Sequence, residues 1–180
     1  MGRMIAIIGR SGMGKSTSLR NLDPKSTLII NWERKELPFK GSSSIPQKRP
    51  KNIKEGFELM EKYCKNPDVK VLVHDSFSAF TDMLLQQAKI LNSGYDIWSY
   101  YNQKIYEYFQ LIKDWTDQKD KHVVVTAHEE TIADEAGIVM RGMKVKGGEW
   151  KGVTEKEFDV VLWADCKIEP NKKPEFFFRT

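Results

Sequence analysis

Residues 4–16 read MIAIIGRSGMGKS, and this stretch decides the fold. Residues 9–16 match the phosphate-binding pattern G-x-x-x-x-G-K-[ST] at every fixed position. The apolar run before them predicts a strand, and the polar run that begins at Lys15 predicts a helix. Glycines let backbone N–H groups turn inward around phosphate oxygens, and a helix that follows points its positive end at the same anion. The stretch therefore predicts a strand, a phosphate-binding loop and a helix.

The loop side chains have expected tasks at a nucleotide triphosphate. Lys15 would reach the β- and γ-phosphates, Ser16 would place its hydroxyl on Mg²⁺, and Thr17 would lie near the α-phosphate. The residues expected to contact the nucleotide are Gly9, Arg10, Ser11, Gly12, Met13, Gly14, Lys15, Ser16 and Thr17. We expect ATP and Mg²⁺ as cofactors. Adenine is favoured over guanine, because the chain lacks the Asn-Lys-x-Asp segment that reads guanine.

A carboxylate at the end of a buried strand is the second expected part of such a site. The run 69–73 predicts a strand, and Asp75 follows it where a carboxylate would hold magnesium, directly or through water. Many ATPases carry a catalytic glutamate directly after this aspartate, whereas this chain has Ser76. The carboxylate that activates water must therefore come from another element.

Glu33 is the candidate for that carboxylate, because it ends the strand that follows the phosphate-binding loop and its helix. Glu36 is the reserve candidate, and either residue can equally be a solvated loop glutamate. His128 follows another predicted strand, so it can sense the γ-phosphate or serve as a structural histidine. The catalytic set is therefore Lys15, Glu33, Asp75 and His128, with Ser16 and Asp75 as metal ligands.

The rest of the chain alternates apolar, β-branched runs with helical periodicity, which predicts an α/β fold with a mainly parallel sheet covered on both faces. The length of 180 residues fits a single domain, 1–180. Strands are expected at 5–8, 27–30, 69–73, 122–126, 158–163 and 175–179, the last two forming a C-terminal hairpin, and helices at 53–64, 79–91 and 97–115.

Two polar, basic stretches interrupt this alternation, at 34–51 and 131–152, and we expect mobile loops there, the second with the alternative of a β-excursion. Residues 1–70 carry 15 Lys and Arg against 7 Asp and Glu, which suits a surface that meets phosphates or nucleic acid. The longest apolar runs are too short to span a bilayer, so no membrane partner is expected. Cys64 and Cys166 have no metal or redox spacing, which favours the cytoplasm.

Together these features resemble the RecA-like branch of P-loop ATPases, and more closely the small phage-encoded, AAA-type ATP-binding proteins of recombination. Besides the loop, Glu33 and Asp75, the resemblance rests on segments 22–25, 37–41, 126–129 and 158–180, and it spans nearly the whole chain. Stretch 146–150 departs from the family pattern, which often shows Gly-Lys-Leu there.

The resemblance implies a RecA-like, mainly parallel sheet flanked by helices and a magnesium-dependent ATPase in the host cytoplasm. It further implies coupling to single-stranded DNA in phage recombination or replication, and partnership with a single-strand-binding or annealing protein. Such enzymes form homo-oligomers in which a neighbour supplies a cation, for which Arg141, Lys144 and Lys146 are candidates, with plain surface charge as the alternative. A nucleotide-gated adaptor and a small-molecule kinase remain as alternative functions.

Overall fold

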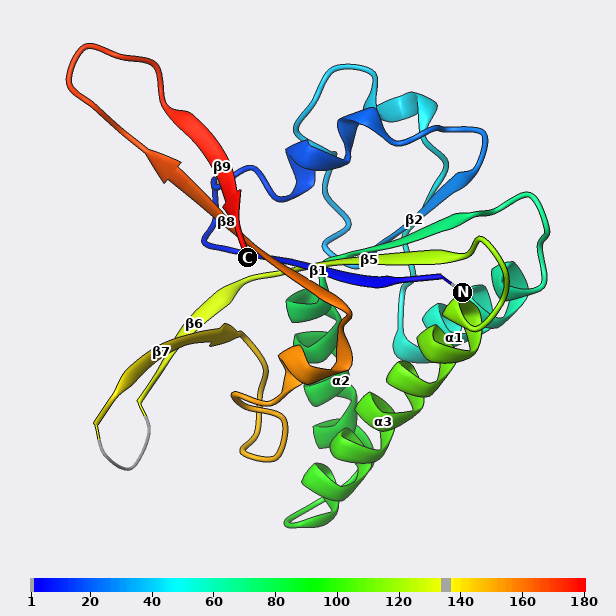
Figure 1. Cartoon of the computed structure of the whole chain (residues 1–180). Coiled ribbons are helices and arrows are strands. Elements are labelled where there is room, and N and C mark those ends of the chain that lie inside the picture. Colours follow the sequence, from blue (N-terminus) through cyan, green and yellow to red (C-terminus); the bar gives the residue numbers. More distant parts are fainter. Residues whose placement is uncertain (1, 134–136) are drawn as a thin grey trace.

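The computed structural model describes residues 2–133 and 137–180, and its centre is a seven-stranded sheet (Figure 1). The strand order is β3-β2-β4-β5-β1-β8-β9; all neighbours pair in parallel except β8 and β9, which form an antiparallel hairpin. The predicted mainly parallel sheet with a C-terminal hairpin is therefore confirmed. The strands are β1 (Met4–Ile8), β2 (Thr27–Asn31), β3 (Gln47–Lys48), β4 (Val71–Asp75), β5 (His122–Ala127), β8 (Val160–Lys167) and β9 (Glu175–Arg179).

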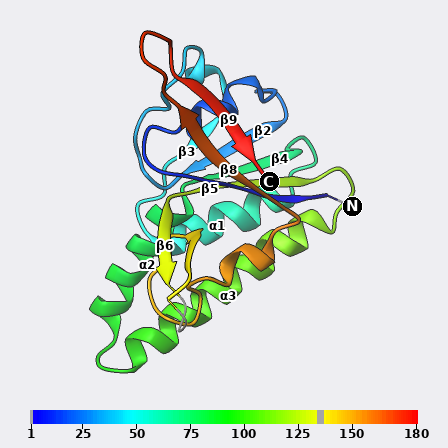
Figure 2. The same cartoon turned by 60° about the vertical axis from the view of Figure 1, so that its left-hand side comes forward.

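Three helices cover one face of the sheet, as Figures 1 and 2 both show. They are α1 (Ile53–Cys64), α2 (Phe77–Leu91) and α3 (Asp96–Thr116). Asn52 caps α1 and Ser76 caps α2, each accepting a hydrogen bond from the backbone N–H three residues on. The larger apolar core lies here, with Tyr108 stacked on Phe80 at a centroid distance of 4.7 Å. No helix within 2–133 and 137–180 has the length and apolar character that crossing a membrane requires.

The opposite face is covered by less regular structure. The segment after the phosphate-binding loop forms a six-residue 3-10 helix, η1 (Ser16–Asn21), followed beyond β2 by η2 (Ser42–Ser44) and β3. A smaller apolar core forms where Leu19, Leu37 and Ile45 pack on this face of the sheet. The basic segment 34–51 therefore contributes Leu37 and Ile45 to this core and also forms a short strand, although its sequence predicts only a loop.

The second basic stretch contains a separate antiparallel pair, β6 (Glu129–Ala133) and β7 (Val139–Met143), so the β-excursion is the alternative that forms. Residues 134–136 of the predicted loop 131–152 lie outside the described residues. The chain then returns against the helices through η3 (Thr154–Glu157). Ser78 donates a 3.2 Å hydrogen bond to the carbonyl of Lys144, and the ring of Trp150 stacks on Phe109 at 5.4 Å. The segment that follows β7 is thereby attached to α2 through Ser78 and to α3 through Phe109.

Candidate nucleotide site

The phosphate-binding loop leaves β1, which lies between β5 and β8. Gly12 and Gly14 have φ angles of 80° and 84°, in the left-handed region that only glycine adopts at little cost. Gly9 packs so closely on β8 that an added Cβ would lie 2.7 Å from the carbonyl oxygen of Ala164. Gly12 and Gly14 thus allow the loop to turn, and Gly9 allows it to pack closely against the sheet.

Lys15 is buried, with 7% of its surface exposed, and its ammonium group folds over the loop. Its Nζ donates hydrogen bonds of 2.8 Å to the carbonyl oxygens of both Gly9 and Arg10. Burial lowers the pKa of Lys15, while the nearby carboxylates of Glu33 and Asp75 act in the opposite direction. The loop therefore carries a cation at its centre, between two acidic groups.

Asp75 ends β4 and is buried beside Ser16. Its Oδ1 accepts a 3.1 Å hydrogen bond from the hydroxyl of Ser16 and another from Thr126 on the neighbouring strand β5. Burial raises the pKa of Asp75, which the hydrogen bond from Thr126 counters. The structure thus brings the two predicted metal ligands together, held by a threonine that sequence reasoning missed.

Magnesium fits this pair by chemistry, since it takes one or two protein oxygens and completes its octahedron with phosphate oxygens and water. Among residues 2–133 and 137–180, no group of three or more His, Cys, Asp or Glu side chains is placed to hold a metal ion. The pair is therefore suited to an ion that arrives with a phosphate ligand.

Glu33 follows β2 and points toward the end of β5. Its Oε1 accepts a 2.9 Å hydrogen bond from Ser76, and the Nε2 of His128 lies 3.6 Å from the same oxygen. His128 and then Ser76 lower the pKa of Glu33 to about 2, against the effect of partial burial, and the ammonium of Lys35 at 3.7 Å acts in the same direction. Glu33 is therefore a firmly ionised carboxylate with a fixed orientation.

These groups share one cleft of about 410 Å³ between the phosphate-binding loop and segment 31–38. Glu36 also borders the cleft, but its carboxylate pairs with Arg49 at 2.6 Å and is largely exposed. Of the predicted site residues, those lining the cleft are Ser11, Gly12, Gly14, Lys15, Ser16, Thr17, Glu33, Asp75 and His128. Asn31, which also lines it, carries no motif that would have marked it in the sequence.

Two residues of the loop direct their side chains elsewhere. Met13 packs against the smaller core, and Arg10 donates a 2.8 Å hydrogen bond to Glu129 at the start of β6. Arg141, a candidate for a cation supplied to a neighbour, is paired within its own chain to Glu129 and to Asp165. The phosphate-binding loop is thus tied to the hairpin of β6 and β7 through a carboxylate shared by two arginines.

Comparison with solved structures supports the fold. The crystal structure of the RadB recombinase matches with a TM-score of 0.63 and 15% identity, over 94% of this chain and 77% of that one. The RecA-like, P-loop α/β fold that the sequence predicts is therefore confirmed. Among curated proteins, none matches the sequence.

The model of the AAA domain matches residues 1–177, which is nearly the whole chain and includes every residue of the cleft. The chain therefore belongs to the AAA domain family.

Proposed function

We propose that this protein binds ATP with Mg²⁺ and hydrolyses it. The main observation that supports this proposal is that one cleft is lined by Lys15, by the pair of Ser16 and Asp75, and by Glu33. Ser76 and His128 hold Glu33 in place. Ser16 and Asp75 would hold the magnesium, which when bound neutralises charge on the phosphates. Lys15 would exchange its two carbonyl partners for phosphate oxygens. Catalysis would then be mostly positioning and electrostatic stabilisation.

The low pKa of Glu33 defines its part in this reaction. A carboxylate with a pKa of about 2 is ionised at neutral pH and is a weak base. The main contribution of Glu33 is therefore to accept a hydrogen bond from the attacking water and to orient that water in line with the phosphate. His128 holds the same oxygen of Glu33, so it is a positioning residue.

Single-stranded DNA is the proposed effector, in the setting of phage DNA recombination or replication. Exposed cations lie beside the site, with Lys35 on the cleft and Lys144 on a neighbouring hollow of about 360 Å³ that also borders Glu33 and His128. A phosphate backbone bound there would act next to the catalytic carboxylate. The similar solved structure is that of the RadB recombinase, which agrees with this setting.

Assembly into a homo-oligomer and association with a single-strand-binding or annealing protein belong to the same proposal. With Arg141 paired inside its own chain, Lys144 is the more available of the candidates for contact with a neighbour, because it is exposed. The ammonium of Lys146, the third candidate, lies 3.8 Å from the carboxylate of Asp82 on α2 and so has a partner within its own chain.

Steady-state ATP hydrolysis tests the proposal, using the wild type, Lys15→Ala and Glu33→Gln. Each is assayed alone, with single-stranded DNA, with double-stranded DNA and with a panel of nucleoside monophosphates. We expect magnesium-dependent turnover that single strands stimulate and that both substitutions abolish. DNA stimulation should weaken steeply as salt is raised, because phosphate contacts release counterions.

Other outcomes would replace the proposal. Phosphate transfer to a monophosphate would identify a small-molecule kinase. Nucleotide binding without turnover, with a partner retained by Glu33→Gln, would identify a nucleotide-gated adaptor. Turnover that no DNA changes at low salt would remove the nucleic-acid part and leave the ATPase.

A further inference from the structure

One edge of the large sheet is formed by β9, which pairs with β8 on one side. Among residues 2–133 and 137–180, no strand lies on its other side. Four of the five residues of β9 are exposed, and Phe177 is half-buried. Natural proteins usually cover or blunt such an edge, because its backbone is a template for pairing with another strand. The outer edge of β9 is therefore a surface to which a further strand can be added.

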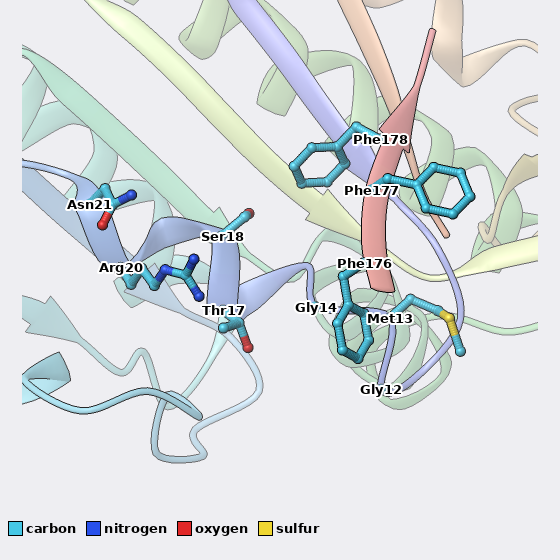
Figure 3. A pocket seen from close by; sticks show the side chains of 10 residues that line it. All are labelled: Gly12, Met13, Gly14, Thr17, Ser18, Arg20, Asn21, Phe176, Phe177 and Phe178. Atoms are coloured by element: carbon cyan, nitrogen blue, oxygen red, sulfur yellow. The ribbon is translucent and has the colours of Figure 1, made fainter. Parts of the chain in front are cut away.

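β9 carries three consecutive phenylalanines that packing within the chain leaves largely uncovered. Phe176 and Phe178 are 55% and 44% exposed and lie on one face of the strand, whereas the ring of Phe177 lies on the other side (Figure 3). Aromatic side chains gathered at the surface are typical of sites that contact another protein. The exposed edge of the sheet is thus also its most aromatic strand.

The two ends of β9 carry opposite charges on the same face of the strand. Glu175 is exposed, and Lys167, which lies opposite it on β8, pairs with Glu169 instead. The Nε of Arg179 lies 3.1 Å from the carboxylate of Asp165, which leaves the two terminal nitrogens of the guanidinium for another acceptor. Both end charges are therefore accessible to a partner.

Antiparallel pairing with β9 of a second copy satisfies all of these features. With Phe177 on a twofold axis, Glu175 of each copy lies opposite Arg179 of the other. Phe176 then lies opposite Phe178, and aromatic pairs and pairs of opposite charge both stabilise a sheet. Parallel pairing in register would instead place each charge opposite its like, which is destabilising. The run EFFFR at 175–179 is thus complementary to itself in the antiparallel orientation.

We infer that two copies of this chain join through β9, so that their two seven-stranded sheets become one continuous sheet. Such a contact is isologous and closes on itself as a dimer. The strand at the opposite edge, β3, has two residues and is too short for this pairing. The inference rests on the homo-oligomer of the proposed function and gives that assembly a surface. Because the paired strands are short, we expect a dimer that dissociates on dilution, as interfaces below about 1,200 Å² do.

Sedimentation velocity over a dilution series tests the dimer, using the wild type, Glu175→Arg and Arg179→Glu. We expect the mass of the wild type to rise with concentration toward twice the 20.9 kDa of the chain. Each substitution turns two attractive contacts into two repulsive ones, so it should raise the dissociation constant about tenfold or more. An equimolar mixture of the two variants should dimerise like the wild type, because opposite charges then face each other again.

Lys173→Glu is the matched control, since Lys173 is an exposed charge on the same hairpin that lies outside the paired run. It should leave the dissociation constant unchanged. Thermal melts of each variant verify folding. Recovery in the mixture is a second check, because a misfolded variant would not regain dimerisation from its partner.

Cysteine cross-linking tests the register, in a background with Cys64 and Cys166 replaced by serine. Phe177→Cys should form a disulfide-linked dimer on oxidation, because directly opposite residues have Cα atoms about 4.5–5.5 Å apart. Phe176→Cys is the control. Its two copies are diagonal neighbours about 7–8 Å apart, a separation that a disulfide does not span.

Four results would overturn the inference. They are a wild type that is monomeric at every concentration, charge reversals that dimerise like the wild type, a mixture that stays monomeric, and a cross-link in Phe176→Cys but not in Phe177→Cys. ATP hydrolysis measured on the same samples separates this failure from that of the proposed function. Hydrolysis by a monomeric wild type would remove the dimer and leave the ATPase, whereas a dimer without hydrolysis would leave the inference and remove the ATPase.

Discussion

The hydroxyl of Ser76 donates a 2.9 Å hydrogen bond to the carboxylate of Glu33, joining the first residue after β4 to the second residue after β2. The position directly after Asp75, where many ATPases carry a glutamate, thus holds the group that orients a glutamate from the neighbouring strand. Ser76 also caps α2, so the orientation of Glu33 is coupled to the start of that helix.

Ser76→Ala should therefore lower kcat without a matching loss of nucleotide affinity. We expect a fall of about tenfold, smaller than the loss in Glu33→Gln, which removes the carboxylate that orients the attacking water. Steady-state kinetics and ADP titration of both variants check this. Ser76→Thr, which keeps the hydroxyl, is the control, and equal kcat in Ser76→Ala and wild type would contradict the positioning role.

Glu33 should contribute to stability in a pH-dependent way. Its pKa is about 2 in the fold against an ordinary value of 4.5, so the unfolded chain binds the proton more readily. The contribution is complete above pH 4.5 and is lost as pH falls toward 2. Urea unfolding should show Glu33→Gln less stable than the wild type at pH 7, with the difference shrinking between pH 4.5 and the acid limit of the fold.

His74 should make the stability of the fold depend on pH over a different range. Burial lowers its pKa to about 3 from 6.5, and its Nδ1 accepts a 3.3 Å hydrogen bond from the indole of Trp32. Below pH 6.5, His74 binds a proton in the unfolded chain but stays neutral in the fold. His74 therefore lowers the free energy of unfolding as pH drops from 6.5. His74→Phe should flatten the decline between pH 6.5 and 4.5. An unchanged slope would show that His74 is protonated in the fold.

Arg141 should act inside its own subunit. It pairs with Glu129 at the start of β6 and, at 3.0 Å, with Asp165 on β8, and its guanidinium lies 4.9 Å from the ring centre of Trp163. Mixing Arg141→Ala with Lys15→Ala should therefore give no more hydrolysis than the sum of the two alone. Restored activity in the mixture would instead show that Arg141 serves a neighbouring subunit.

Gly56 on α1 lies against the core with no room for a larger residue. A Cβ there would lie 2.0 Å from the ring of Trp32, the residue that precedes Glu33. Gly56→Ala should cost about 1–3 kcal/mol of overpacking, partly offset by about 1 kcal/mol of helix propensity. Denaturant unfolding measures the net loss. Gly148→Ala is the control, because its Cβ would meet nothing within 4 Å, and equal stability of the two variants would contradict the expectation.

The fold was predictable because its signals are local. Alternating apolar runs locate the strands to within a few residues, and 175–179 coincides with β9. The errors in predicted secondary structure occur in segments whose conformation depends on tertiary contacts. The segment from Ser16 forms a 3-10 helix, and β3 forms two residues long because Ile29 and Ile30 of β2 offer it an edge. Neither leaves a periodicity in the sequence.

The site was predictable where a motif or a strand end marks it, as for Lys15, Glu33 and Asp75. Their catalytic roles remain predictions, although the structure brings them into one cleft. Thr126 was missed as a site residue because it acts from a strand distant in sequence. A threonine inside an apolar strand looks like an ordinary sheet residue until the sheet order is known.

The smaller core has a practical consequence for engineering. Leu37 and Ile45 are 5% and 3% exposed, and they fasten both ends of a short connection whose middle residues, 38–44, lie mostly at the surface. Insertions and charge changes are best tolerated where exposed backbone lies between fixed ends. A dye, an affinity tag or an altered charge placed at the exposed Ser43 should therefore be tolerated, because the two anchors on either side preserve the architecture around it.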